Sequence, residues 1–330
     1  MIDEMRKVSL GIAAAAAGII LLFLLLRTGP SGSKGAKNPE TILQLGWGGG
    51  PGEAGRHEGG ESAPVGPMSF TVLPSGEIYI LDQVNVRVLR FEPGSKKSSQ
   101  IPVGSDTFQD LAVAADGTIV LLDRLVRRAV VLMDTGGNEL AFHAVEGDGI
   151  PEGGAVTAMF LEKDGLWLEV NHERSVRILD ESLAPCPRTV RRGRPLDGGS
   201  KTVAAFLDKQ GGVKMRILDT PTGAVTAEKH FPLGQDLYRI AWIEADASGA
   251  VHAMFHLLEP QAENAPGPPD EKVLALRLGK DLEETGSFES PHTIRAWEQF
   301  KEFEVAGVGT VYQMAFSDQG VTLLSWRYEP

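Results

Sequence analysis

One pattern of hydrophobic and polar positions recurs along the chain. A short apolar strand is followed by a tight turn that contains glycine, and then by a second strand of β-branched and aromatic residues. The turns contain Ser-Gly, Asp-Gly or Gln-Gly pairs, which suit the positive φ angles of tight hairpins. Each copy is therefore predicted to be a β-hairpin. The copies span residues 70–82, 111–123, 158–170, 204–218, 243–255 and 314–326.

The spacing of these hairpins indicates a propeller. Their turn glycines lie 41, 48, 46, 38 and 71 residues apart. Further strands follow the first two copies, at residues 86–93 and 128–134, and four short strands in roughly 40–50 residues are typical of a propeller blade. We expect one all-β domain over residues 41–330, a six-bladed β-propeller. The turn glycines are Gly76, Gly117, Gly165, Gly211, Gly249 and Gly320.

Three segments depart from the repeat. Residues 259–271 contain four prolines and almost no apolar residue, so they are expected to form an exposed insertion. Residues 292–305 resemble either a second, helix-like insertion or a strand. The last copy lacks an outermost strand, whereas residues 41–47 form a lone strand at the other end of the domain. We expect residues 41–47 to complete the sixth blade, because closure removes exposed strand edges.

The first 40 residues have a different character. Residues 8–26 are almost entirely apolar and long enough for one transmembrane helix, with a cleaved signal peptide as the alternative. Residues 1–7 are predicted to be a cytoplasmic tail, and residues 27–40 a flexible linker. Basic residues are nearly balanced across the span, so the orientation depends on similarity to bacterial signal anchors. That similarity predicts a single-pass bacterial inner-membrane protein with its propeller in the periplasm.

The first hairpin and its flanks resemble an NHL-repeat propeller. The family pattern has a proline before the inner strand, a glycine turn, an aspartate ending the second strand, and then Asn-x-Arg-Val. The second copy keeps Gly117, Asp123 and Arg128 but has Val126 where asparagine is expected, and the resemblance extends over residues 42–180. We expect each repeated Asp and Arg to hold a loop between strands. In the first copy the residues are Pro67, Gly76, Asp82, Asn85, Arg87 and Val88.

Composition excludes several classes of function. The single Cys186 cannot form an intramolecular disulfide or a multi-thiolate metal cluster. The chain has a formal net charge of −12, of which residues 1–37 contribute +3, and this leaves −15 for residues 38–330. A domain of that charge repels nucleic acid and anionic membranes. The sequence contains no nucleophile-elbow, phosphate-loop or dinucleotide motif, and no catalytic residue or cofactor is predicted from it.

Two groups of side chains are candidate sites. Four arginines form a basic cluster in a segment expected to be the loop between the third and fourth copies. Guanidinium forks suit an acidic partner or a phosphate group, and a solvated loop is the alternative. His252 and His256 would share one face of a strand, where they are weak candidates for a metal site. The arginines are Arg188, Arg191, Arg192 and Arg194.

These observations predict a membrane-tethered propeller that binds or organises other envelope or membrane proteins. The alternative is a metal-dependent six-bladed propeller enzyme, a lactonase-like hydrolase or a lyase, which the resemblance associates with a divalent metal such as calcium in the central channel. A third possibility is a structural subunit whose transmembrane helix itself contacts partners through small residues. The propeller fold alone does not choose among them.

Overall fold

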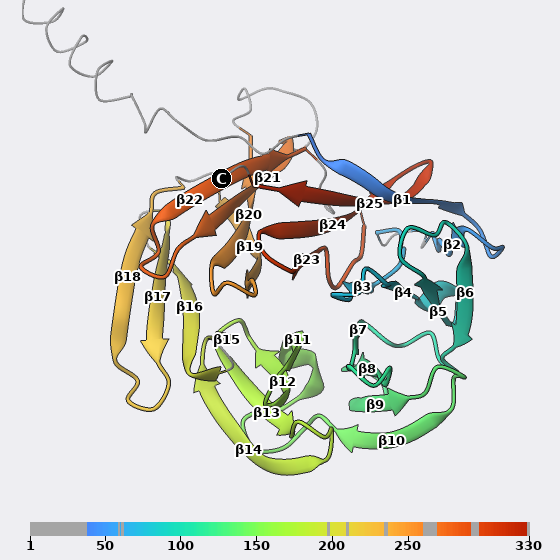
Figure 1. Ribbon diagram of the computed structural model, residues 1–330, viewed down its shortest axis with the longest axis horizontal. Coiled ribbons are helices and arrows are strands. Elements are labelled where there is room, and N and C mark those ends of the chain that lie inside the picture. Colours follow the sequence, from blue (N-terminus) through green and yellow to red (C-terminus); the bar gives the residue numbers. More distant parts are fainter. Residues whose placement is uncertain are drawn as a thin grey trace, which may run out of the picture. The chain divides into compact units, whose positions relative to one another are not determined.

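The computed structural model describes residues 38–328 except residues 59, 61–62, 197–198, 209–210, 234–236, 260–268 and 292–296. Apart from two short 3₁₀ turns, η1 (Gln83–Asn85) and η2 (Gly153–Ala155), the ordered elements of this part are strands. They form six sheets around a common centre, which confirms the predicted six-bladed propeller (Figure 1). In the first five blades the first strand is innermost and later strands lie progressively further out.

The first blade contains β3 (Ser69–Val72), β4 (Ile78–Asp82), β5 (Arg87–Phe91) and β6 (Ser98–Pro102), and the second contains β7 (Asp110–Val113), β8 (Ile119–Asp123), β9 (Ala129–Met133) and β10 (Glu139–Ala144). The third contains β11 (Val156–Glu162), β12 (Gly165–Val170), β13 (Arg174–Leu179) and β14 (Pro185–Arg192), and the fourth contains β15 (Arg194–Leu196), β16 (Lys201–Leu207), β17 (Val213–Asp219) and β18 (Val225–Phe231). The fifth contains β19 (Leu237–Ala245), β20 (Val251–Leu258), β21 (Glu271–Leu278) and β22 (Glu284–Ser290).

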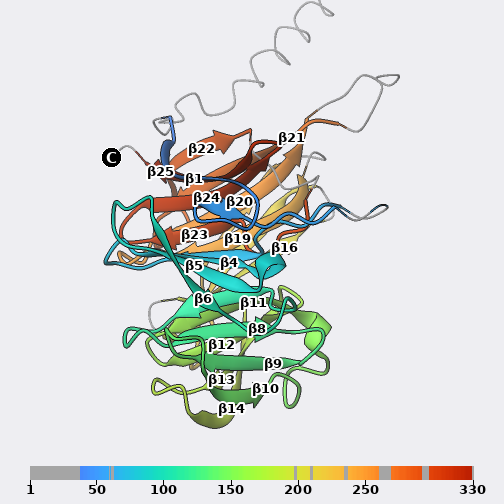
Figure 2. The ribbon, with the colours of Figure 1, turned by 90° about the vertical axis from the view of Figure 1, so that its right-hand side faces the viewer.

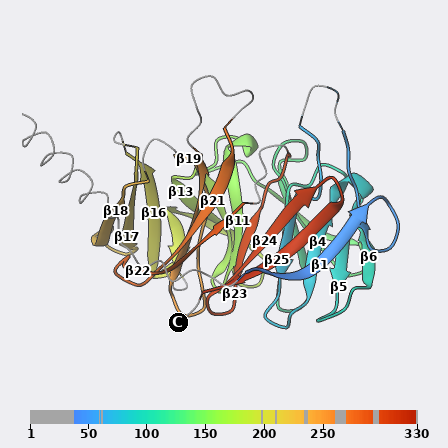
Figure 3. The same ribbon diagram turned by 90° about the horizontal axis from the view of Figure 1, so that it is seen from above.

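The sixth blade joins the two ends of the described chain. It contains β23 (Phe303–Ala306), β24 (Thr310–Ser317) and β25 (Gly320–Arg327), and its outer strand is β1 (Glu40–Trp47), followed by the short β2 (Glu53–Ala54). β1 pairs antiparallel with β25 and lies beside it on the outside of the blade (Figure 3). The prediction that residues 41–47 complete the sixth blade is confirmed.

Neighbouring blades bury each other's faces, and this explains the sequence of the central strands. In the second blade β8, β9 and β10 lie side by side (Figure 2), and every residue of β8 and β9 is buried. Because both faces of these strands are covered, they are continuous apolar runs. The outer strand β10 alternates between exposed and half-buried positions instead.

Two of the six predicted hairpins occupy a different place in their blades. Hairpins one, two, three and five join the innermost strand to the second, but hairpins four and six are the second and third strands. β15 consists of Arg-Pro-Leu, and β23 lies at the end of segment 292–305, whose pattern also suits a helix, so neither strand shows a clear hairpin pattern. This shift, together with the insertion after β20, explains the long interval of 71 residues between the last two turn glycines.

The segment 292–305 is a strand where it is described at its end, because β23 begins at Phe303. Residues 292–296 and the centre of the proline-containing insertion, residues 260–268, lie outside the described residues. So do the predicted tail and membrane span and most of the linker. No helix among the described residues is long and apolar enough to cross a membrane.

The repeated aspartates hold loops, as expected, but their arginines do so in only one copy. Asp82 binds Arg87 Nε at 2.8 Å, and Arg87 also donates to the Gly49 carbonyl at 2.9 Å. In the second copy Asp123 accepts a hydrogen bond from the Val126 amide at 2.9 Å. Arg128 lies 3.4 Å from Glu146 rather than at Asp123.

Candidate functional site at the channel mouth

The innermost strands of the blades surround the centre of the ring (Figure 1). Residues on or beside five of these strands line one cavity. It has a volume of about 240 Å³ and is lined by parts of β3, β7, β11, β19 and β23 and of the turns after them. We call this cavity the channel mouth. Its lining combines apolar side chains with ionisable ones. The ionisable residues are Glu162, Glu244, Lys301 and Glu304.

A buried ion pair lies at the channel mouth. Lys301 Nζ is 2.9 Å from Glu304 Oε2, and both side chains are less than a tenth exposed. Glu304 Oε1 accepts hydrogen bonds from Thr71 Oγ1 at 2.7 Å and from the Val72 amide at 3.0 Å, so it links the sixth blade to the first. Burial lowers the pKa of Lys301, but the surrounding carboxylates outweigh burial and leave its pKa above the ordinary value. The lysine is therefore charged at neutral pH.

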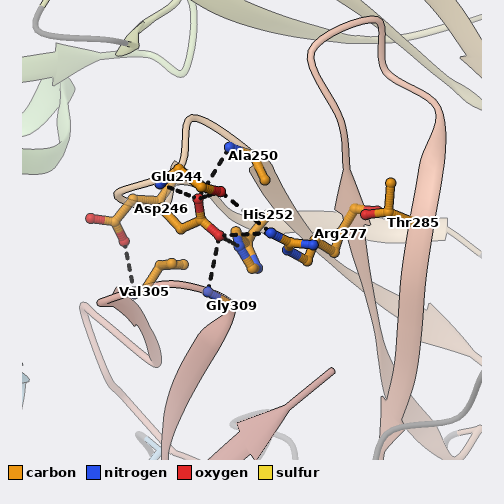
Figure 4. Close-up of polar contacts among 9 residues, drawn as sticks. Glu244, Asp246, Ala250, His252, Arg277, Thr285, Val305 and Gly309 are labelled. Carbon is orange, nitrogen blue, oxygen red and sulfur yellow. Dashed lines mark hydrogen bonds and ion pairs between the residues drawn. The ribbon is translucent and has the colours of Figure 1, made fainter. Parts of the chain in front are cut away.

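Glu244, on β19, has no such cation of its own. Its Oε2 accepts a hydrogen bond from Trp242 Nε1 at 2.8 Å. The same oxygen accepts a hydrogen bond from the Val305 amide at 3.0 Å (Figure 4). Burial raises the pKa of Glu244 to about 7, Glu304 adds to the rise, and Lys301 opposes it. Glu244 therefore takes up a proton much closer to neutral pH than an exposed glutamate does.

Two further carboxyl groups near the centre have raised pKa values. Asp110 is fully buried and accepts hydrogen bonds through Oδ1 from Ser69 Oγ at 2.5 Å and from the Leu111 amide at 2.8 Å. Burial is the main cause of its raised pKa, as it is for Glu162 in the lining of the channel mouth. Carboxyl groups thus outnumber cations in this part of the ring.

A second buried ion pair lies between the third and fourth blades. Arg194 donates from Nε to Glu169 Oε1 at 2.5 Å and from Nη2 to Glu169 Oε2 at 2.9 Å. Its Nη1 donates to the Ile243 carbonyl at 2.6 Å, and the guanidinium lies 4.8 Å from the ring centroid of Trp242. Burial raises the pKa of Glu169, but Arg194 and, after it, His172 more than reverse this and lower it to about 2. This carboxylate is ionised throughout the neutral range.

The segment that contains the predicted arginine cluster is not a loop but parts of two strands. Arg188, Arg191 and Arg192 lie on β14, the outermost strand of the third blade, and Arg194 begins β15, the innermost strand of the fourth. An outermost strand is half exposed, so its polar sequence was mistaken for a loop. Arg188 donates to the carbonyls of residues 144–146. The structure does not bring the buried Arg194 together with the three arginines of β14.

The two candidate metal-binding histidines have separate partners. His252 Nε2 lies 3.1 Å from Asp246 Oδ2, in a network that joins the fifth and sixth blades (Figure 4). His256 lies between Glu271 and Glu302, with its Nε2 2.8 Å from Glu302 Oε2. Four residues of strand separate the Cα atoms of the two histidines by roughly 13 Å. Within the described part of the chain, no group of three or more His, Cys, Asp or Glu side chains could hold a metal ion.

None of the four ionisable residues of the channel mouth was predicted from the sequence. One signal was present in residues 301–305, KEFEV, where charged and apolar residues alternate as on a strand with one polar face. A second signal was Glu244, a charged residue within the first strand of the fifth hairpin. Neither signal indicates that the two segments meet at the centre of a ring.

No protein-family model and no curated protein sequence matches the chain. Among solved structures, it is similar to a member of the DUF4221 family from Bacteroides vulgatus, with 10% identity, a TM-score of 0.52, and coverage of 90% of this chain and 99% of that one. It is similar to U3-55K with 9% identity, a TM-score of 0.50, and coverage of 82% and 97%. Virginiamycin B lyase from Staphylococcus aureus is similar with 15% identity, a TM-score of 0.43, and coverage of 79% of this chain and 95% of that one. The first two similarities support the propeller fold, and at such identities they show the fold alone.

Proposed function

We propose that the protein is a membrane-tethered, extracytoplasmic binding module that holds partner proteins of an envelope complex. In this proposal residues 8–26 anchor the chain in a bacterial inner membrane, residues 27–40 form the tether, and the propeller lies in the periplasm. The channel mouth takes one cationic side chain, a lysine or an arginine, from the partner protein.

The observation that carries this proposal is the excess of carboxyl groups over cations at the channel mouth. Three glutamates and one lysine line it, and the lysine is paired with one of the glutamates. Burial without a cation of its own raises the pKa of Glu244 to about 7. A nearby positive charge favours the ionised form of a carboxyl, so an incoming ammonium or guanidinium group and ionised Glu244 would stabilise each other.

The size and lining of the cavity favour a side chain over a free metabolite. Its volume of about 240 Å³ is below the roughly 300–1,000 Å³ of typical small-molecule sites. Leu73, Pro74 and Leu161 contribute apolar surface to the lining. Lysine and arginine have apolar stems that pack on such surfaces while the charged head reaches a polar group.

A second candidate function, that of a propeller enzyme, is favoured by the same Glu244. A carboxyl with a pKa of about 7 suits general acid–base catalysis near neutral pH. The comparison to make is the hydrolysis of lactone and ester substrates by the wild-type chain and by Glu244→Gln, with calcium and after chelation. Turnover that is lost in the variant would favour the enzyme over the binding module.

The binding proposal is tested with three probes on the full chain in detergent micelles. They are the N-acetyl methylamides of lysine, arginine and norleucine, the last being a neutral analogue of lysine. We expect the two cationic probes to bind and to release a fraction of a proton at pH 7, because binding favours ionised Glu244. Their affinity should fall as the pH is lowered below about 6, where Glu244 is protonated.

Two variants complete this test. Glu244→Gln should weaken the binding of the cationic probes at least about tenfold, a change of about 1.4 kcal/mol. The matched control is Glu139→Gln, whose ion pair with Arg127 lies on the exposed outer strand of the second blade, and it should bind as the wild type does. Equal affinity for all three probes, or unchanged affinity in Glu244→Gln, would contradict the proposal.

The location is tested separately, by adding protease to intact spheroplasts of a bacterium that expresses the full chain. We expect the propeller to be degraded while a membrane-embedded fragment is retained. A propeller that is digested only after lysis would contradict the periplasmic location.

A further inference from the structure

A second cavity lies between the third and fourth blades, away from the channel mouth. Its volume is about 430 Å³, and it shares no lining residue with the channel mouth. Strands β13 and β14 of the third blade and β16 of the fourth contribute to it. We call this cavity the basic cleft. It is lined by Glu173, Arg174, Val190, Arg191, Arg192 and Phe206.

The arginines of the basic cleft are held in place by neighbouring groups. Arg191 donates from Nη1 to the Gly199 carbonyl at 2.8 Å, and its guanidinium lies 4.5 Å from the ring centroid of Trp167. The guanidinium of Arg192 lies 4.9 Å from the ring centroid of Phe206. Side chains fixed in this way lose less conformational freedom when a ligand binds.

Two of these arginines have no acidic partner. Arg174 donates from Nε to the Gly149 carbonyl at 3.2 Å, and neither Arg174 nor Arg192 forms an ion pair with any described carboxylate. The two residues are opposite each other in the pairing of β13 with β14. They present neighbouring unpaired cations on a domain whose net charge is −15 over residues 38–330. Such a positive area attracts acidic groups.

The cleft also offers apolar surface and a strand edge. Val190 is 50% exposed, and the ring of Phe206 is half-buried under Arg192. β14 is the outermost strand of its sheet, so one of its edges is unpaired among the described strands. Unpaired strand edges can bind an extended peptide through backbone hydrogen bonds.

We propose that the basic cleft binds an acidic peptide segment of a partner protein. One carboxylate of the segment is held by the guanidinium groups of Arg174 and Arg192, and a neighbouring apolar side chain packs on Val190 and Phe206. A free phosphate would use the arginines but leave the apolar half of the cleft uncovered, so the lining favours a peptide. The basic cleft is a second binding surface in addition to the channel mouth. Its positive charge selects an acidic segment, whereas the channel mouth takes a cationic side chain.

The experiment uses the full chain in nanodiscs of uncharged phosphatidylcholine and fluorescent peptides of alternating Asp and Leu. Peptides in which Asn or Lys replaces Asp serve as controls. We expect only the Asp peptide to bind, with an affinity that falls as salt is raised from about 50 to 300 mM, because salt screens exposed charges. Equal binding of the Asn peptide would overturn the proposal.

Variants locate the binding. Arg192→Gln, which changes an exposed side chain, should weaken binding of the Asp peptide at least about tenfold, and Phe206→Ala should also weaken it. The matched control is Arg127→Gln, whose partly exposed side chain pairs with Glu139 on β10, another outermost strand, and this variant should bind normally. Melting temperatures verify that each variant is folded. Unchanged affinity in Arg192→Gln would overturn the proposal.

Two further measurements distinguish the acidic peptide from other ligands and the basic cleft from the channel mouth. Inorganic phosphate and vesicles of anionic lipid are tested against the same variants. If they bind in an Arg192-dependent way and the Asp peptide does not, the cleft is a phosphate site and the peptide proposal is wrong. Glu244→Gln should leave binding of the Asp peptide unchanged, so failure at one cavity is distinguishable from failure at the other.

Discussion

Two buried glutamates inside the ring titrate in opposite directions. The pKa of Glu169 in the third blade is lowered to about 2, and that of Glu244 in the fifth is raised to about 7. Burial raises both values, so it does not explain the difference. Arg194 binds both oxygens of Glu169, at 2.5 and 2.9 Å, whereas the cation near Glu244, Lys301, is 2.9 Å from Glu304.

The comparison shows that a dedicated cation, rather than depth, decides what a buried carboxyl can do here. Glu169 and Arg194 satisfy each other, and the bond from Arg194 to the Ile243 carbonyl extends the pair to the fifth blade. Glu244 is held by the neutral donors Trp242 Nε1 and the Val305 amide. The first carboxyl fixes blades to one another, and the second remains able to respond to a cation from outside.

Arg194→Met removes the cation that pairs with Glu169 and should have the largest effect on stability. Removing one member of a buried ion pair leaves the other charge without a partner, so the free energy of unfolding should fall by about 3–5 kcal/mol. Urea denaturation at pH 7 measures this. The control is Arg127→Met, which removes a half-exposed pair with Glu139 and should lose less than about 1 kcal/mol. Similar losses in both variants would show that the Glu169 pair is not special.

Lys301→Met removes the one cation among the described residues that line the channel mouth, so it tests the surroundings of Glu244 rather than those of Glu169. It should lower the free energy of unfolding by roughly 3 kcal/mol at pH 8, because Glu304 loses its partner. The loss should be smaller at pH 5. At that pH Glu244, whose pKa burial raises to about 7, holds a proton and so relieves the repulsion. An identical loss at both pH values would contradict this account.

Glu244→Gln should stabilise the protein. Since the folded pKa of about 7 exceeds the ordinary 4.5, the folded state holds an extra proton between these pH values, and stability falls as the pH rises through that window. At about 1.4 kcal/mol for each pKa unit, the variant should gain roughly 1–3 kcal/mol at pH 8 and almost nothing at pH 4.5. Thermal melts across this range measure it, and a destabilised variant at pH 8 would refute the assignment.

His172→Ala should have the smallest effect. His172 Nδ1 lies 3.0 Å from Glu169 Oε2, but the histidine side chain is 57% exposed. Exposed pairs contribute little, so the free energy of unfolding should change by less than about 1 kcal/mol while Arg194 still holds Glu169. A loss as large as that of Arg194→Met would mean that the histidine shares the role of the arginine.

Much of the fold was predictable because it is encoded locally. The turn at Gly76 and the strands on either side of it lie within 13 residues of sequence, 70–82, and the same is true of most copies. The lone strand 41–47 was assigned to the sixth blade because each blade needs a fourth strand. β15 escaped prediction because Arg-Pro-Leu shows no strand pattern, and β23 stayed ambiguous because segment 292–305 has a pattern that also suits a helix.

The candidate sites were less predictable because they depend on contacts between distant segments. Thr71 and Glu304 form a hydrogen bond although 233 residues separate them. The sequence showed that arginines cluster near residue 190, but whether Arg194 is exposed depends on where the chain passes from β14 to β15. That step leaves Arg192 exposed at the rim and Arg194 buried inside, although the two residues are neighbours in the sequence.

The pairing of β1 with β25 also determines when the ring can close during synthesis. Glu40 pairs with Ser325, so 284 residues must be made between the two partners. At translation rates of about 5–20 residues per second, β1 waits roughly 15–60 s before its partner exists. Throughout that time Leu43 and Leu45, each 3% exposed in the finished ring, are open to proteases and chaperones. A ribosome that stalls before β25 would therefore release a propeller that cannot close.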